Sequence, residues 1–122
     1  MPQNQQEPLN RQQIEQLARI KFPPSSKEIE VHTESGIDRL IVLRFTLDQT
    51  DLNHFLINAG YTESLKPGFR PFNSQELGNI PWWNPDEAQE VMGGFLNTEN
   101  WASEVMVDVS GTEPLVYLKA YD

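Results

Sequence analysis

A change of hydrophobic period between residues 37 and 61 limits what this chain can fold into more than any other feature does. In the first half, apolar residues alternate along one side of an extended strand, namely Ile41, Leu43, Phe45 and Leu47. In the second half they recur with the spacing of one helical face, namely Leu52, Phe55, Leu56 and Ala59. The other side of the strand carries Leu40 and Val42, which favours a central place in a sheet. We therefore expect this strand and this helix to share one apolar interior.

The segments before this stretch predict a helix and a second strand. Asn10 can cap a short helix whose apolar stripe is Ile14, Leu17 and Ala18. Residues 28–33 alternate apolar and polar side chains, as in a strand with one wet face. The turn formers Ser35 and Gly36 then predict a β-hairpin with the central strand.

The segments after it predict one helix and two closing strands. Asn84-Pro85-Asp86-Glu87 has the pattern of a helix start, with an asparagine cap, proline at the first position and acidic residues in the first turn. This helix is expected to end at Gly93-Gly94. Residues 104–109 and 115–121 alternate as strands on either side of a turn at Ser110-Gly111.

These elements predict an α+β domain in the order α-β-β-α-α-β-β. Its sheet is expected to be four-stranded and mostly antiparallel, built from two β-hairpins, with helices packed on one face. The length fits a single domain over residues 9–122. Residues 1–8, MPQNQQEP, lack any apolar period and predict a disordered tail.

Composition excludes several classes of protein. The chain has no cysteine, which rules out disulfides, thiolate metal sites and cysteine nucleophiles. Its net charge of −9 argues against nucleic acid as a partner. After Trp83 the chain has eight carboxylates and only one basic residue, Lys119. This part of the chain is therefore either a solvated acidic surface or a docking site for a basic partner. No apolar run approaches the roughly 20 residues that cross a bilayer.

Residues that could carry chemistry are sparse. The glycines do not form a phosphate-binding loop, and no serine stands in a nucleophile-elbow pattern. His32 and His54 lie on different predicted elements, and a metal site would need a carboxylate beside both of them. The acidic residues fall at caps, on polar strand faces and in turns, where they stay solvated. The sequence therefore predicts no metal and no cofactor, and it favours a protein that is not an enzyme.

An aromatic loop is the unusual feature of the chain. Six of its twelve aromatic residues fall within 33 residues that are otherwise rich in turn formers, namely Phe69, Phe72, Trp82, Trp83, Phe95 and Trp101. In one interpretation these rings form a satellite core beneath a long loop. In the other, some of them line a groove with Arg44 or Arg70 as a polar anchor. Because neighbouring residues rarely point the same way, one of Trp82 and Trp83 is expected to be less buried than the other.

Six short segments also suggest a family resemblance. They are FPPSS at 22–26, DRLIVLRF at 38–45, DLNHFL at 51–56, LKPGFRPF at 65–72, PWWNP at 81–85 and VYLKA at 116–120. Together they resemble a small family of uncharacterised bacterial domains, some of which are similar to envelope-associated or lipoprotein-like proteins. The resemblance implies no catalytic residue. It implies a place at the cell envelope if an export or anchor segment precedes the chain, whereas the chain as given predicts a cytoplasmic protein.

Three functional hypotheses follow. The first is a non-enzymatic binding or protein-interaction domain, a monomer or weak dimer, whose aromatic loop at 69–101 and acidic surface hold a protein or a small cationic ligand. Its candidate binding residues are Phe69, Arg70, Phe72, Trp82, Trp83, Trp101 and Arg44. The alternative is a small hydrolase or ligand-processing domain with a pocket between loop 62–83 and the sheet. The third is a structural domain of a larger assembly.

Overall fold

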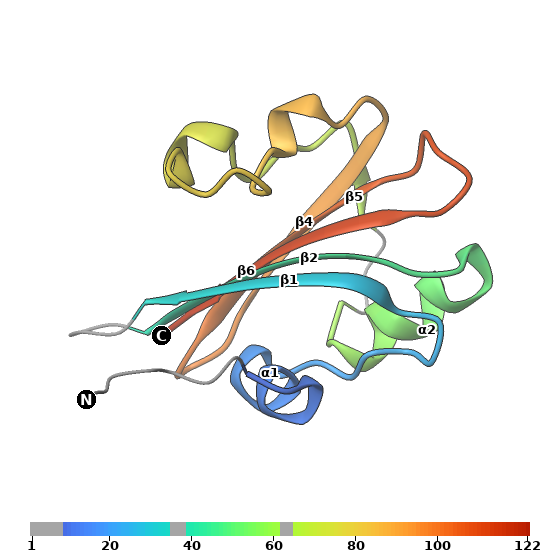
Figure 1. The fold of residues 1–122 in the computed structure, drawn as a ribbon. Coiled ribbons are helices and arrows are strands. Elements are labelled where there is room, and N and C mark those ends of the chain that lie inside the picture. The colour runs from blue at the N-terminus through green and yellow to red at the C-terminus, as the bar shows by residue number, and fades with distance from the viewer. Residues whose placement is uncertain (1–8, 35–38, 62–64) are drawn as a thin grey trace.

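The structure, a computed structural model, describes residues 9–34, 39–61 and 65–122 (Figure 1). Its helices are α1 (Arg11–Ala18) and α2 (Gln49–Asn58), with short 3-10 helices η1 (Ser74–Leu77) and η2 (Pro85–Glu87). Its strands are β1 (Lys27–Glu34), β2 (Leu40–Thr46), β3 (Lys66–Pro67), β4 (Val91–Asn97), β5 (Ala102–Asp108) and β6 (Leu115–Tyr121). The predicted tail at 1–8 and the predicted turn at Ser35-Gly36 lie outside the described residues.

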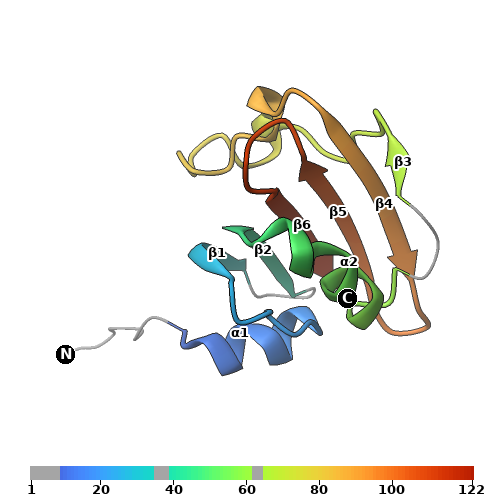
Figure 2. The same cartoon turned by 90° about the vertical axis from the view of Figure 1, so that its right-hand side faces the viewer.

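All strands of the described chain belong to one antiparallel sheet in the order β1-β2-β6-β5-β4-β3 (Figure 2). The α+β class and the antiparallel pairing are thus confirmed. The predicted four-stranded sheet and the predicted order of elements are wrong, because the sheet has six strands. Two of them, β3 and β4, come from segments where the sequence predicts a loop and a helix.

The helix predicted after Asn84 is a single 3-10 turn, η2, and the chain then extends into β4. Pro85 begins the turn as predicted, but the side chain of Asn84 makes no capping hydrogen bond, and the next amides bond elsewhere. The backbone N–H groups of Gln89 and Glu90 donate to the carboxylate of Asp108, both at 3.4 Å. Burial opposes ionisation of Asp108, yet these bonds and those from Ser110 lower its pKa. Pairing of β4 with β5 then outweighs the local helix preference.

Helices α1 and α2 cover one face of the sheet, the lower face in Figure 1. Leu52, Phe55 and Leu56 of α2 are buried there, as the hydrophobic period predicts. The ring of Phe55 meets the ring of Phe45 edge to face, with centroids 5.3 Å apart. Strand β2 and helix α2 therefore share one interior.

Segment 69–90, with η1 and η2, covers part of the opposite face (Figure 1). Val42 of β2 points into this second core, whereas Leu43 points into the first, and neither side chain is exposed. The central strand is consequently buried on both faces. This explains why both of its sides are apolar.

Tyr61, which follows α2, offers a test of the packing between α2 and the sheet. Its hydroxyl group shares a buried hydrogen bond with that of Ser103 on β5, and burial raises the pKa of Tyr61 to about 12. Unfolded tyrosine releases its proton near pH 10, so the free energy of unfolding is expected to fall as the pH rises from about 10 to about 12. Absorbance titration should show a late phenolate step that is missing in Tyr61→Phe. A Tyr61→Phe protein with an unchanged titration would contradict this packing.

Candidate functional site

Three of the six rings of the aromatic loop, those of Phe72, Trp82 and Trp83, lie in or against the second core. Trp83 is only 2% exposed, and Trp82 is half-buried beside it, which confirms that the two differ in burial. The ring of Trp83 lies 4.9 Å from that of Phe72 and 5.6 Å from that of Tyr117, measured between centroids. Its indole N–H donates to the carbonyl oxygen of Asn73 at 3.1 Å. Trp83 is thus held by both packing and a hydrogen bond.

Arg44 of β2 holds the backbone of this loop. Its Nη1 donates to the carbonyl oxygen of Trp82 and to Oδ1 of Asn84, both at 2.9 Å. The hydroxyl group of Tyr117 donates to the same Oδ1 at 2.8 Å. Burial raises the pKa of Tyr117, and the charge of Arg44 partly offsets this. Asn84 therefore joins the loop to two strands of the sheet.

Arg70 plays a similar part from within the loop. Its guanidinium donates to the carbonyl oxygens of Pro85 at 3.3 Å and Ala88 at 2.7 Å, so it anchors the segment between η2 and β4. Phe69 next to it is exposed. Arg44 and Arg70 are thus both bonded to backbone carbonyl oxygens of the loop.

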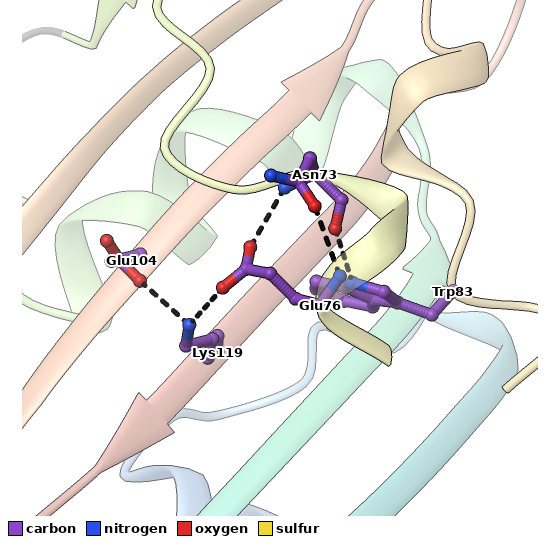
Figure 3. A network of polar contacts seen from close by, with 5 residues as sticks. All are labelled: Asn73, Glu76, Trp83, Glu104 and Lys119. Atoms are coloured by element: carbon purple, nitrogen blue, oxygen red, sulfur yellow. Dashed lines mark hydrogen bonds and ion pairs between the residues drawn. The ribbon is translucent and has the colours of Figure 1, made fainter. Parts of the chain in front are cut away.

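A polar network pins η1 to the sheet (Figure 3). Asn73 and Glu76 form a reciprocal cap, in which each side chain accepts the other's backbone N–H. Nζ of Lys119 on β6 lies 2.8 Å from Oε2 of Glu76 and 3.6 Å from Oε1 of Glu104 on β5. Burial lowers the pKa of Lys119, but the two carboxylates outweigh it and raise that pKa. The loop, including the Trp83 contact to Asn73, is thereby fastened along its length.

Trp101 is the predicted binding residue that lies apart from the second core. It follows β4 in a turn where its carbonyl oxygen accepts the N–H of Thr98 at 2.8 Å. The guanidinium carbon of Arg19 lies 5.3 Å from the centroid of its ring. Trp101 packs against the helix-side core and not against the second core.

Trp101 and Arg19 line a cavity of about 670 Å³, here called the α1 cleft, between α1 and the ends of the strands. Its aliphatic lining comes from α1, the segment before it and the strands: Leu9, Leu17, Val31, Leu40, Ile41 and Ala120. Its polar lining includes Arg19, Glu34, Arg39 and Asp122. The strand residues Val31, Ile41 and Ala120 belong to the helix-side core, whereas Leu40 packs against the second core. The cleft therefore lies at the ends of the strands, mainly on the side of the sheet opposite Trp83.

Most charges at the α1 cleft are paired. Arg39 and Asp122 form a two-armed ion pair with N–O distances of 3.0 and 2.6 Å, which lowers the pKa of Asp122. Glu34 lies 3.0 Å from Nε2 of His32. In the part of the chain that the structure describes, no carboxylate lies within ion-pair distance of Arg19. The guanidinium of Arg19 lies instead against the ring of Trp101.

The exposure of Leu17 is the main difference between the predicted and the observed helix α1. The sequence places Leu17 in the buried stripe, but its side chain is 45% exposed and lines the α1 cleft. Helix α1 ends one residue later, at Ala18, because Arg19 adopts a left-handed conformation with φ of 60°. Leu17 thus adds an exposed apolar side chain to the aliphatic lining of the α1 cleft.

The cleft draws on parts of the chain that are far apart in sequence, which is why no local pattern indicated it. Gln16 and Leu17 come from α1, whereas Ala120 and Tyr121 come from the end of β6. Of the candidate binding residues that the sequence indicated, only Trp101 lines the cleft. No residue of 65–83, the described part of the loop where the sequence predicts a pocket, lines this cleft.

Comparisons with protein families, curated proteins and solved structures found no match to the chain. The resemblance to a bacterial domain family therefore stays a prediction. Neither α-helix of the described residues is long and apolar enough to cross a membrane.

Proposed function

We propose that this protein is a non-enzymatic binding domain whose ligand lies in the α1 cleft. The class is the one that the sequence favours, but the site moves from the aromatic loop to the opposite side of the sheet. The observation that carries the proposal is Leu17, 45% exposed beside an aliphatic floor in a cavity of about 670 Å³. Cavities of roughly 300–1,000 Å³ with apolar walls and few polar groups are typical ligand sites.

The lining indicates the chemistry of the ligand. Leu17, Ile41 and Ala120 offer an apolar surface on which an aliphatic or aromatic group loses water. Arg19 offers a planar set of N–H donors at the rim, which suits a carboxylate, sulfonate or carbonyl acceptor. A ligand with an apolar body and an acceptor group therefore fits better than the small cationic ligand that the net charge favours.

The polar groups of the cleft support binding rather than catalysis. A general base needs a carboxylate free to take a proton. Asp122 is instead bonded to Arg39, which lowers its pKa, and Glu34 is bonded to His32. Asp122 thus joins the end of the chain to Arg39, and Glu34 contacts a residue of its own strand.

The dye anilinonaphthalene sulfonate, an apolar ring system with one anionic group, tests the cleft directly. The wild-type protein is expected to bind it with a rise in dye fluorescence. Leu17→Glu should weaken this binding by about tenfold, because it replaces apolar contact area with a charge of the same sign as the dye. Arg19→Gln should weaken it by about tenfold through loss of a charged hydrogen-bond donor. Fluorescence titration measures both dissociation constants.

Two matched variants serve as controls. Ile57 stands next to the end of α2 as Leu17 does in α1, and it is 54% exposed away from the cleft, so Ile57→Glu should leave dye binding unchanged. Lys21→Gln removes a positive charge outside the cleft lining and should also leave it unchanged. Dye binding that falls equally in Leu17→Glu and Ile57→Glu would place the dye elsewhere and overturn the proposal.

A further inference from the structure

Strand β1 presents an unpaired edge of the sheet beside the α1 cleft. Within the described residues β1 pairs with β2 alone, and Figure 2 shows it as the outermost strand on its side. The other edge, β3, has only two residues, whereas β1 has eight. The register between β1 and β2 is regular from Glu30 to Glu34, after an irregularity between Lys27 and Glu30. Along this stretch of five residues, alternate residues turn their N–H and C=O groups away from β2 and offer them to another strand.

The α1 cleft opens onto this edge. Val31 and Thr33 line it, and both side chains are on the helix side of β1. Residues of an added strand would alternate between the two faces, as those of β1 do. A side chain of the added strand next to Val31 or Thr33 would therefore enter the cleft. Its neighbours in sequence would stand on the other face beside Glu30, His32 and Glu34, the last of which also lines the end of the cleft.

The charged residues of β1 indicate which side chains an added strand would need at these neighbouring positions. Glu28, Glu30 and Glu34 belong to β1, and the whole chain carries a charge of −9. Among the described residues, no cation lies within ion-pair distance of Glu30, and Glu34 meets only His32. Opposite charges on neighbouring strands attract, and like charges repel. A second copy of this acidic strand would therefore pair poorly, whereas a segment with lysine or arginine at alternate positions would pair well.

We propose that the ligand of the α1 cleft is an extended polypeptide segment that adds a strand to β1. An apolar side chain of this segment lies in the cleft near Leu17, and basic side chains on either side of it lie beside Glu30 and Glu34. Backbone hydrogen bonds supply affinity in this mode, and the cleft supplies specificity. The inference rests on the proposed function, because it takes the cleft as the binding site and names the class of ligand.

The probe is a labelled peptide, acetyl-Lys-Thr-Lys-Leu-Lys-Thr-amide, whose lysines share one face and whose leucine stands on the other. Fluorescence anisotropy is expected to show saturable binding to the full chain. The double variant Glu30→Gln and Glu34→Gln should weaken binding by about tenfold through loss of two cross-strand charge pairs. Glu87→Gln with Glu90→Gln makes the same change of charge at exposed positions away from β1 and should leave binding unchanged.

Two N-methylated peptides separate strand pairing from simple charge attraction. Alternate N–H groups of a strand point to opposite sides, so methyl groups on one alternate set face β1 and those on the other set face solvent. One analogue should lose at least about tenfold in affinity through lost ladder hydrogen bonds, and the other should bind as the parent does. Equal binding of both analogues, or equal losses in the two double variants, would overturn the inference.

The dye experiment keeps the two proposals apart. Dye binding that depends on Leu17, together with no binding of the peptide, would overturn strand addition and leave the cleft as the binding site. Peptide binding through β1 with no dependence on Leu17 would overturn the placement of the apolar side chain. Sedimentation that shows a concentration-dependent dimer weakened by the Glu30 and Glu34 substitutions would make a second copy the partner and would also overturn the inference.

Discussion

Replacing Trp83 by alanine is expected to lower the free energy of unfolding by about 3–5 kcal/mol, the usual cost of removing a large buried ring. The indole is 2% exposed and lies among Phe72, Trp82 and Tyr117. Its removal would leave a cavity in the second core and would free the carbonyl oxygen of Asn73. Chemical denaturation monitored by circular dichroism measures the change.

Phe95→Ala is the matched control for Trp83→Ala. Phe95 is also a large aromatic residue of the 69–101 region, but it is 62% exposed on β4, so its loss should change the free energy of unfolding by less than about 1 kcal/mol. The sequence-based hypothesis that Trp82 and Trp83 bind a partner expects little change in melting temperature from either tryptophan. A Trp83→Ala protein as stable as the wild type would favour that hypothesis and contradict the packing described above.

Gly93→Ala is expected to destabilise the fold by about 1–3 kcal/mol, the range for forcing extra atoms into a packed interior. A Cβ atom at Gly93 would lie 2.4 Å from the carbonyl oxygen of Phe69 and 3.2 Å from that of Val105. Both neighbours are backbone, which cannot turn aside as a side chain can. The chain after β3, or the ladder between β4 and β5, would have to move, and thermal unfolding would report the loss.

Gly94→Ala, one residue further along β4, is the control for that substitution. There the nearest atom is Cδ2 of Leu65, at 2.8 Å, which is the end of a flexible side chain. The leucine can rotate away, so Gly94→Ala should cost less than Gly93→Ala. Equal losses in the two variants would mean that the backbone contact between Phe69 and Gly93 is not what limits the size of the side chain.

These stability tests concern the side of the sheet opposite the proposed binding site. Trp83 packs the 69–90 segment against the sheet, and Gly93 leaves room for the backbone of Phe69 beside β4, whereas Leu17 and Arg19 line the α1 cleft. Substitutions in the first pair should therefore act on stability, and those in the second pair on ligand binding. This separation allows each proposal to be tested without unfolding the protein.

Several elements could be predicted because their signals are local. The i, i+3, i+4 and i+7 spacing that starts at Leu52 depends only on the direction of side chains within one helix. The cap at Asn10 likewise depends on a contact three residues away, with Gln13. The helix predicted from Asn84 failed for the complementary reason. Its first turn forms, but the following residues gain more from pairing with β5 than a helix would give them.

The candidate site was less predictable than the fold. The sequence singled out the 69–101 region as unusual and gave a structural alternative, a satellite core, which agrees with the burial of Phe72 and Trp83. From the sequence alone, loop anchoring by Arg44 and Arg70 cannot be distinguished from ligand recognition, because both roles use the same guanidinium N–H donors. Only Trp101 among the candidates lines the α1 cleft. The role of all these residues in binding stays a prediction.

The sequence by itself determined which segments carry an apolar face that must be buried, among them β2 with Leu43 and α2 with Phe55. It also determined the acidic charge and the absence of cysteine. Only the tertiary structure decided that Val91–Asn97 is a strand, that segment 69–90 covers the second face, and that Leu17 faces a cleft. The physical reason is that hydrophobic period reports the direction of a side chain, whereas what it meets depends on which distant segment packs there.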